Sequence, residues 1–379
     1  MGHEIREPIE EELLPGDRLR YFHPTHPGDV LGGRFKTIAK LGFGTGSTVW
    51  LAENLKFKKR KKSPKFVSIK IAALDTDASR EMMYSKLISH AKPSHEGLSF
   101  IRIPIDEFRL QGPQDLKDDN IMVTIENDSI LADFISSQTN SPHPRHIRSE
   151  DGRITYLSQR DFGPLRGSRL LPELADFNLS YPGLENGLGH LSAIQSHRFR
   201  APEVLLGCPW SYSADIWNLG LLMWNLLQDI SLFDRPAGKD GEYDAHVHLA
   251  QMVSLLGDPP EELIKRERIY REHQLKQPVT NSYGRACKTM NEFWGGPFFD
   301  DDKELTNGLL LDKILRSDLV GKGKMLGDTV TELNGDDKQA FLDFASGMLQ
   351  WLPEKRKTAK ELLQHPFFDP LCKDSAGYE

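Results

Sequence analysis

The chain has 379 residues and a net charge of −7 at pH 7, with 38% of its residues hydrophobic and 27% charged. That length is enough for one large domain or two smaller ones, and the composition excludes a disordered chain, a collagen and a coiled coil. The negative net charge gives no overall sign of direct nucleic-acid binding. The three widely spaced cysteines exclude a disulfide framework and a zinc finger.

The first third of the chain predicts mainly strands. Residues 1–29 are acidic and then rich in proline and histidine, which favours an extended leader. Stretches rich in β-branched and aromatic residues follow, and a glycine-rich turn joins the first two. The predicted strands are 34–41, 48–52, 66–72 and 100–108, with a helix expected at 76–90.

The rest of the chain predicts helices after an irregular segment. Residues 126–172 are rich in Ser, Pro, His and Arg with weak periodicity, so we expect a surface insertion there. Apolar periodicity then predicts helices at 214–227, 246–256, 338–349 and 358–363. Strands first and helices later indicate an α+β protein with a small sheet lobe and a large helical lobe. The expected divisions are an N-terminal extension (1–29), a sheet lobe (30–112), a helical lobe (113–370) and a tail (371–379).

The turn between the first two predicted strands matches the pattern G-x-G-x-x-[G/S]-x-V. Its candidate nucleotide-contacting residues are Leu41, Gly42, Phe43, Gly44, Thr45, Gly46, Ser47 and Val49. Glycines in such a hairpin let the backbone approach nucleotide phosphates, and Val49 would cover the base. A dinucleotide-binding turn would open a helix, whereas a β-prone stretch follows here. An ordinary glycine hairpin is the alternative for this motif taken alone.

A lysine and a glutamate behind the glycine turn form a second candidate pair. Lys70 ends the pattern V-S-I-K of a predicted strand, and Glu81 lies on the predicted helix that follows. A lysine that reaches nucleotide phosphates needs a carboxylate to fix its ammonium group, and Glu81 could supply it. The alternative is a solvated charge at a strand end.

The segment 115–123 fits D-[LI]-K-x-x-N followed by an apolar strand. In-line phosphoryl transfer needs a carboxylate to accept the hydroxyl proton, a cation near the γ-phosphate and an amide oxygen on Mg²⁺. Asp115, Lys117 and Asn120 have these side chains in that order. This motif is much more specific than the glycine turn.

Four further motifs follow downstream: L-A-D-F-N at 174–178, R-A-P-E at 200–203, S-A-D-I-W-N-L-G at 213–220 and the segment 356–368. In this order the motifs resemble the eukaryotic protein-kinase family over roughly residues 30–370. Within that family the chain looks most like the SR-protein-specific serine/threonine kinases, particularly small fungal members. The features that carry this likeness are Tyr21-Phe22-His23-Pro24, Leu51-Ala52 and the long insertion between Asn120 and Asp176.

The resemblance implies a bilobal fold with ATP and Mg²⁺ as cofactors. It implies transfer of the γ-phosphate to Ser or Thr hydroxyls of protein substrates, with Arg/Ser-rich splicing factors as the expected class. Asn120 and Asp176 would hold the metal, Glu203 would pair with Arg356, and Asp215 would cap the catalytic-loop backbone. We expect a monomer of the cytoplasm and nucleus, with no membrane partner and no direct nucleic-acid partner.

A literal D-F-G at 161–163 competes with the metal-binding role of Asp176. The metal-binding Asp should end an apolar strand, yet polar residues precede Asp161, whereas Leu174 and Ala175 precede Asp176. We therefore assign the metal to Asp176. In that motif Asn178 replaces the usual glycine, which stiffens the turn.

The segment before Asp115 departs from the family pattern. A complete kinase has a fifth strand, a hinge and two helices there, about 50 residues at usual element lengths. Here Phe108 leads through only six residues to Asp115, and position 114 is Gln. Either the gene model has skipped an exon, which we favour, or the chain is a truncated variant acting as a catalytically dead binding module. Without the hinge and two helices, the apolar face of 214–227 loses its main partner.

Two weaker patterns remain. The basic run 56–65 predicts either a nuclear-import or docking patch, or a solvated hairpin tip. His246 and His248 lie two apart on a predicted helix and so face different directions, which makes them poor joint metal ligands.

Overall fold

The computed structural model describes residues 4–58, 64–74, 79–91, 98, 100–102, 121–123, 128–141, 143–164, 166, 172–174, 180–181, 189–234, 236–300, 314–321 and 325–368. They belong to two compact units, Met1–Ser180 and Tyr181–Glu379. We expected the division after residue 112. It falls later because the strands and the helix that follow the predicted catalytic motif belong to the first unit.

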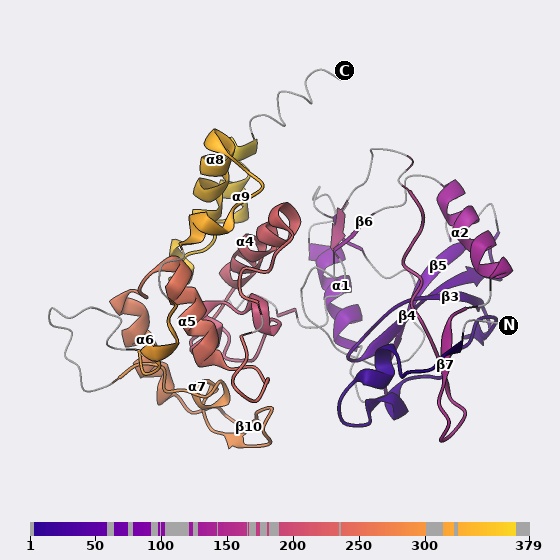
Figure 1. Cartoon of the computed structure of the whole chain (residues 1–379), viewed down its shortest axis with the longest axis horizontal. Coiled ribbons are helices and arrows are strands. Elements are labelled where there is room, and N and C mark those ends of the chain that lie inside the picture. Colours follow the sequence, from indigo (N-terminus) through magenta and orange to yellow (C-terminus); the bar gives the residue numbers. More distant parts are fainter. Residues whose placement is uncertain are drawn as a thin grey trace. The chain divides into compact units, whose positions relative to one another are not determined.

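An antiparallel sheet forms the centre of the first unit (Figure 1). Its order is β2-β3-β4-β5, and its strands are β2 (Val30–Leu31), β3 (Phe35–Gly44), β4 (Ser47–Asn54) and β5 (Phe66–Ala72). Three of the predicted strands are therefore confirmed. Alternating side chains give the sheet two apolar faces. Trp50 and Ile71 lie in the cluster on one face, and Ala39 and Leu51 in the cluster on the other.

Both faces of this sheet are covered by segments that we had expected to lie outside the core. On one face, Tyr156 of β8 (Ile154–Tyr156) packs in the cluster of Trp50 and Ile71. On the other, Phe134 of α2 (Asp128–Asn140) packs against Ala39 and Leu51. The interpretation of 126–172 as a surface insertion was therefore wrong for these elements. The segment is mostly polar, but it contains a few apolar residues that are buried in the fold.

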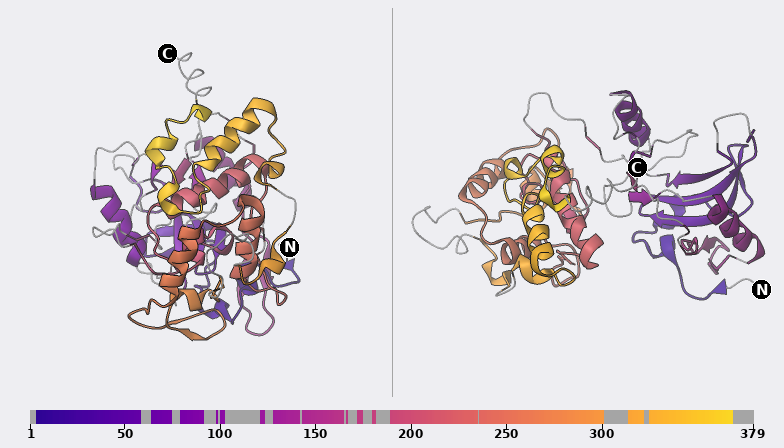
Figure 2. Two further views of the ribbon diagram at one scale, coloured as in Figure 1. Left: turned by 90° about the vertical axis from the view of Figure 1, so that its left-hand side faces the viewer. Right: turned by 90° about the horizontal axis from the view of Figure 1, so that it is seen from above.

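The N-terminal residues are also part of this unit rather than an extended leader. They form β1 (Glu4–Ile5), η1 (Glu10–Leu13) and η2 (Arg18–Tyr21). β1 pairs in parallel with β7 (Arg145–Ile147), which pairs with β8. Leu19 and Phe22 are buried. Figure 2 gives a second view of these N-terminal segments, drawn in indigo.

The remaining elements of the first unit are α1 (Ser79–Ala91), which confirms the predicted helix, and the strand pair β6 (Ile121–Val123) and β9 (Pro172–Leu174). Ile101 makes a single bridge to Leu174. The rest of the predicted strand 100–108 lies outside the described residues.

The second unit is helical (Figures 1 and 2). Its helices are α3 (Pro202–Leu205), α4 (Ser213–Gln228), α5 (Ala245–Leu256), α6 (Glu261–Arg271), α7 (Met290–Phe293), α8 (Gly335–Ser346) and α9 (Ala359–Leu362). Short pieces connect them: η5 (His197–Phe199), β10 (Val279–Thr280), β11 (Ala286–Cys287), η7 (Ser317–Leu319), η8 (Leu326–Thr329), η9 (Pro353–Lys355) and η10 (Pro366–Phe368). The four helices predicted after residue 200 are confirmed within a few residues.

Local signals explain where these helices begin and end. The Asp244 carboxylate accepts a hydrogen bond from the His246 backbone N–H at 2.8 Å and so caps the start of α5. Gly257, with φ +78°, ends that helix. At α9, Thr358 and Glu361 exchange side-chain to backbone hydrogen bonds of 3.3 and 2.8 Å in a capping box.

Helix α4 lies at the centre of the core of the second unit. Trp217 and Trp224 are fully buried, and Trp224 Nε1 donates to Thr329 Oγ1 at 2.8 Å. Gly220 lets the Leu349 side chain pack closely against α4, because a Cβ built at position 220 would lie 2.8 Å from Leu349 Cδ2. Among the described residues no helix is both long and apolar enough to cross a membrane.

Candidate functional site

The glycine turn is the tip of the β3–β4 hairpin. Gly42 is opposite Val49 and Gly44 is opposite Ser47, so Thr45 and Gly46 form the turn. The register shifts between Lys40 and Gly42. Gly42 does not have a positive φ, and a Cβ built on it would meet only the Arg160 side chain, at 3.8 Å. Neither backbone conformation nor crowding within the described chain requires a glycine at this position, so its role in contacting a nucleotide stays a prediction.

Lys70 lies on β5, the strand next to this hairpin. It is paired in register with Val49, and directly opposed residues of an antiparallel pair lie on the same face. The Lys70 side chain is half-buried. Glu81 lies on α1, but its side chain is outside the described part of the structure, so the Lys70–Glu81 pair stays a prediction.

The predicted catalytic and metal-binding residues Asp115, Lys117, Asn120 and Asp176 lie outside the described residues, as does Asn178. The strands to which they attach are described. Asn120 is bonded to Ile121, the first residue of β6, and Asp176 follows Leu174, the last residue of β9, by two positions. Ile121 and Leu174 are direct partners in the antiparallel β6–β9 pair. The described residues that adjoin the two candidate ligands in sequence are therefore partners in one strand pair.

A magnesium site at Asn120 and Asp176 stays a prediction, since neither side chain is among the described residues. Carboxylate and amide oxygens are ligands that Mg²⁺ takes, usually keeping several waters. Within the described part of the chain, no three His, Cys, Asp or Glu side chains cluster as a metal site.

The literal D-F-G forms a local turn. Asp161 is exposed, and its Oδ1 accepts a hydrogen bond from the Gly163 N–H at 2.8 Å. Gly163 has φ +83°, a left-handed conformation that favours glycine. The Phe162 ring stacks on Phe134 of α2, with centroids 4.3 Å apart. This geometry gives each of the three residues a structural reason that needs no metal.

One face of the glycine hairpin is covered by this same region. Leu41 and Phe162 are both partly buried and pack against the cluster of Ala39, Leu51 and Phe134. Helix α2 thus lies over the sheet face that carries Leu41. The sequence did not predict this, because the contact joins residues about 90 positions apart.

In the second unit the pair predicted from the family resemblance is confirmed. Arg356 Nη1 and Nη2 donate to Glu203 Oε1 and Oε2 at 2.7 and 2.6 Å. Both side chains have no exposed surface, so the pair is not a surface salt bridge. Asp215 lies in the first turn of α4 with an exposed side chain, and the catalytic-loop backbone that it was expected to cap is outside the described residues.

Gln195 is a structural residue that the sequence did not indicate. Its Oε1 accepts a hydrogen bond from the Ala201 N–H at 2.8 Å, and its Nε2 donates to the Ala214 carbonyl at 3.0 Å. The residue is buried and has φ +67°. It therefore ties the R-A-P-E segment to the start of α4. A single Gln has no pattern that could have identified it.

The two weaker sequence patterns were the histidine pair and the basic run. The histidines have local partners, and the basic run lies partly outside the described residues. His246 Nε2 is 3.1 Å from the Gly295 carbonyl, and His248 Nδ1 is 3.1 Å from the Tyr243 hydroxyl. The two rings thus have separate partners. Residues 59–63 of the basic run are outside the described residues.

Comparisons with known proteins agree with these motifs. A model of the protein kinase domain family matches residues 168–368. A serine/threonine protein kinase of Aspergillus fumigatus is 28% identical over 406 aligned residues, covering 95% of this chain and 90% of that protein. Serine/threonine-protein kinase SKY1 of Saccharomyces cerevisiae is 31% identical over 195 residues, covering 50% of this chain and 21% of its own.

Solved structures share the fold. The crystallised kinase domain of PF14_0431 aligns with a TM-score of 0.53 and 18% identity, covering 92% of this chain and 99% of that one. The expected bilobal α+β class is thereby confirmed. Since the family model matches more than half of its residues, the chain belongs to the protein kinase domain family.

Proposed function

We propose that this protein is an ATP-dependent protein serine/threonine kinase that transfers the γ-phosphate to hydroxyl groups of protein substrates. The observation that carries the proposal is the β6–β9 pair, which joins the chain next to Asn120 to the chain just before Asp176. The same compact unit contains the glycine hairpin and Lys70. Phosphoryl transfer requires a site that binds the nucleotide phosphates and a pair of oxygen ligands for the metal.

Each residue has a separate role in this proposal. The backbone of Gly42–Gly46 approaches the phosphates, and Lys70, held by Glu81, neutralises their charge. Asn120 and Asp176 hold Mg²⁺, which when bound offsets the charge on the phosphate oxygens. Asp115 orients the substrate hydroxyl and accepts its proton, and Lys117 lies near the transferred group.

Arg/Ser-rich proteins are the substrate class that we propose. The sequence resembles the SR-protein kinases, and SKY1 is among the similar proteins. The net charge of −7 also favours encounter with basic substrates at low ionic strength.

The test is phosphate transfer from labelled ATP to an Arg/Ser-repeat peptide by the purified full-length chain, with variants at the two competing aspartates. Asp176→Asn should abolish transfer, whereas Asp161→Asn should retain it, because Asp161 only closes a local turn. Transfer that survives Asp176→Asn, or is lost only in Asp161→Asn, would overturn the metal assignment.

A second candidate is a binding module without catalysis. Two observations favour it: Phe162 and α2 cover the sheet face that carries Leu41, and the chain runs from Gln114 directly into Asp115 without a hinge. In addition, the Leu226 side chain of α4 is 68% exposed, although other apolar residues of that helix are buried. This candidate predicts no thermal shift with Mg-ATP, whereas a saturable shift supports the kinase.

Tryptic peptides of the native protein would decide whether the short connection exists in the cell. The chain as written releases residues 110–117 as one peptide. Finding this peptide supports the binding module. A different peptide ending in Asp-Leu-Lys, accompanied by hinge peptides, supports a complete kinase.

A further inference from the structure

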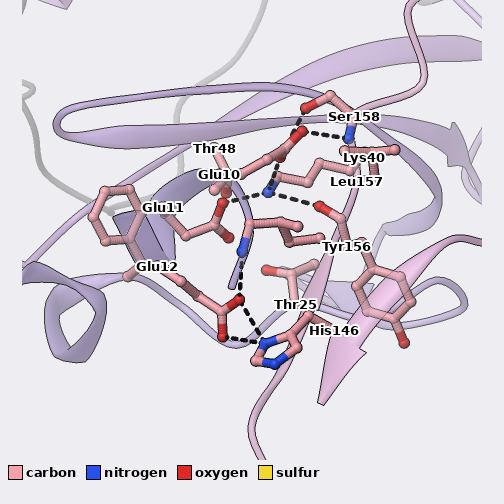
Figure 3. A network of polar contacts seen from close by, with 12 residues as sticks. Glu10, Glu11, Glu12, Thr25, Lys40, Thr48, His146, Tyr156, Leu157 and Ser158 are labelled. Carbon is pink, nitrogen blue, oxygen red and sulfur yellow. Dashed lines mark hydrogen bonds and ion pairs between the residues drawn. The ribbon is translucent and has the colours of Figure 1, made fainter. Parts of the chain in front are cut away.

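A buried lysine lies directly beside the glycine turn. Lys40 is on β3, two residues before Gly42, and is only 1% exposed. Its ammonium group lies 2.5 Å from Glu10 Oε2, contacts Glu11 Oε2 and donates to the Tyr156 carbonyl at 3.0 Å (Figure 3). The ammonium group therefore donates hydrogen bonds to Glu11 and Tyr156 and forms an ion pair with each of the two carboxylates.

The two carboxylates come from the N-terminal segment and are themselves buried. Glu10 and Glu11 are 9% and 7% exposed. Glu10 also accepts hydrogen bonds from the Ser158 backbone N–H at 2.6 Å and from its hydroxyl at 2.9 Å. Burial raises the pKa of Glu11, and the charge of Lys40 opposes that change. Three separate parts of the chain, η1, β3 and residues 156–158, therefore meet at one charge cluster.

The tip of the hairpin is held from the same N-terminal segment. Arg18 Nε donates to the carbonyl of Thr45, the first residue of the turn, at 3.1 Å. Three residues further, the Tyr21 carbonyl accepts from the Leu74 N–H at 2.9 Å, just after β5. The Gly46 carbonyl accepts from the Ala73 N–H at 2.7 Å. The glycine turn is thus fastened at its tip by Arg18 and at its base by Lys40.

These contacts restrict a segment that glycine would otherwise leave free. Glycine loses more backbone entropy on ordering than other residues, and a ligand that must order a loop binds more weakly. A buried charge without its partner is strongly unfavourable, so Lys40 has no alternative position of similar energy. The hairpin is therefore ordered before any ligand arrives.

We infer that Glu10, Glu11, Lys40 and Arg18 are positioning residues, which fix the glycine hairpin in the conformation that receives nucleotide phosphates. The inference rests on the proposed function, since it names what supports the proposed nucleotide site. None of the four is assigned contact with the nucleotide.

The test compares Glu11→Gln and Arg18→Gln with Glu12→Gln in the full-length chain. Glu12 is in the same short helix, but its carboxylate binds His146 Nδ1 at 2.8 Å instead of Lys40. Losing a charge-assisted hydrogen bond at the hairpin should raise KM for ATP about tenfold. The kcat should stay within about twofold, because the reacting groups are untouched. Glu12→Gln should change neither.

Amide hydrogen exchange without nucleotide separates this inference from the proposed activity. The N–H groups of residues 42–47 should exchange faster in Glu11→Gln and Arg18→Gln than in the wild type and Glu12→Gln. Equal exchange in all four proteins, or an equal rise of KM in Glu12→Gln, would overturn the positioning role. If the wild type does not bind ATP, the proposed function fails, and the exchange result alone decides whether these residues order the hairpin.

Discussion

Arg356 and Glu203 form a two-pronged ion pair, with donor–acceptor distances of 2.7 and 2.6 Å and no exposed surface on either side chain. Arg356 also donates to the Ser213 carbonyl at 2.9 Å and to the Gln350 carbonyl at 3.1 Å. One guanidinium group therefore connects α3, the start of α4 and the segment before α9. This pair fixes the end of the R-A-P-E segment against the helical core.

Arg356→Gln should destabilise the protein by about 3–5 kcal/mol, because it leaves the Glu203 carboxylate buried without a countercharge. The measurement is urea unfolding of the full chain followed by tryptophan fluorescence. The matched control is Arg266→Gln, which removes another two-pronged pair, with Glu354, at 3.2 and 2.6 Å. Glu354 is 44% exposed, so the control should cost less than about 1 kcal/mol. Equal losses in both variants would contradict the role of burial.

Gly220→Ala should destabilise the protein although alanine favours a helix by about 1 kcal/mol. The new methyl group would lie 2.8 Å from Leu349 Cδ2, and overpacking costs about 1–3 kcal/mol. Gly327→Ala is the control, since a Cβ there would lie 3.6 Å from Leu342 Cδ1, an ordinary contact.

The same steric explanation predicts coupling with Leu349. Leu349→Ala alone should cost about 2–5 kcal/mol, and the double variant with Gly220→Ala should cost less than the two single losses together. The free energies of unfolding of the four proteins form the cycle. Additive losses would mean that Leu349 is not what excludes a side chain at position 220.

The stability should fall as the pH is lowered below about 6.5, in part because of His248. This ring is fully buried, and its pKa lies well below the usual 6.5 because burial and the nearby Arg200 disfavour the charged form. Below pH 6.5 the unfolded chain therefore binds a proton that the folded chain does not, and the stability present above that pH is lost. His248→Gln should reduce the slope of unfolding free energy against pH between about 6.5 and 5 by up to about 1.4 kcal/mol per pH unit.

Phe134→Ala should cost about 3–5 kcal/mol, because Phe134 is only 4% exposed and packs against Ala39, Leu51 and Phe162. Ser136→Ala, two residues away on the exposed side of α2, should change the unfolding free energy by less than about 0.5 kcal/mol. Thermal or urea unfolding of both variants measures the difference. If Phe134→Ala were as mild as its control, α2 would not belong to the core of the first unit.

Much of the fold follows from local sequence. The β3–β4 hairpin and β5 are predicted because alternation of side chains and a glycine turn are short-range signals. Helices α4 and α5 are predicted because their apolar residues recur with the helical period and are bounded by turn residues. The Glu203–Arg356 pair was expected from the resemblance to protein kinases, and the structure confirms it.

Some residues belong to the core only because of the tertiary structure. Their packing or ion-pair partners lie far away in the sequence. Glu10 and Glu11 lie in an acidic segment that is typical of a solvated leader. Only the position of Lys40 makes them part of the core. Likewise, Phe134 and Tyr156 are isolated apolar residues in a polar segment, and their burial depends on the two faces of a sheet formed by residues 30–72. Periodicity depends only on a residue's neighbours in the sequence. The burial of a charge or a single aromatic ring depends on neighbours in space, which only the assembled fold provides.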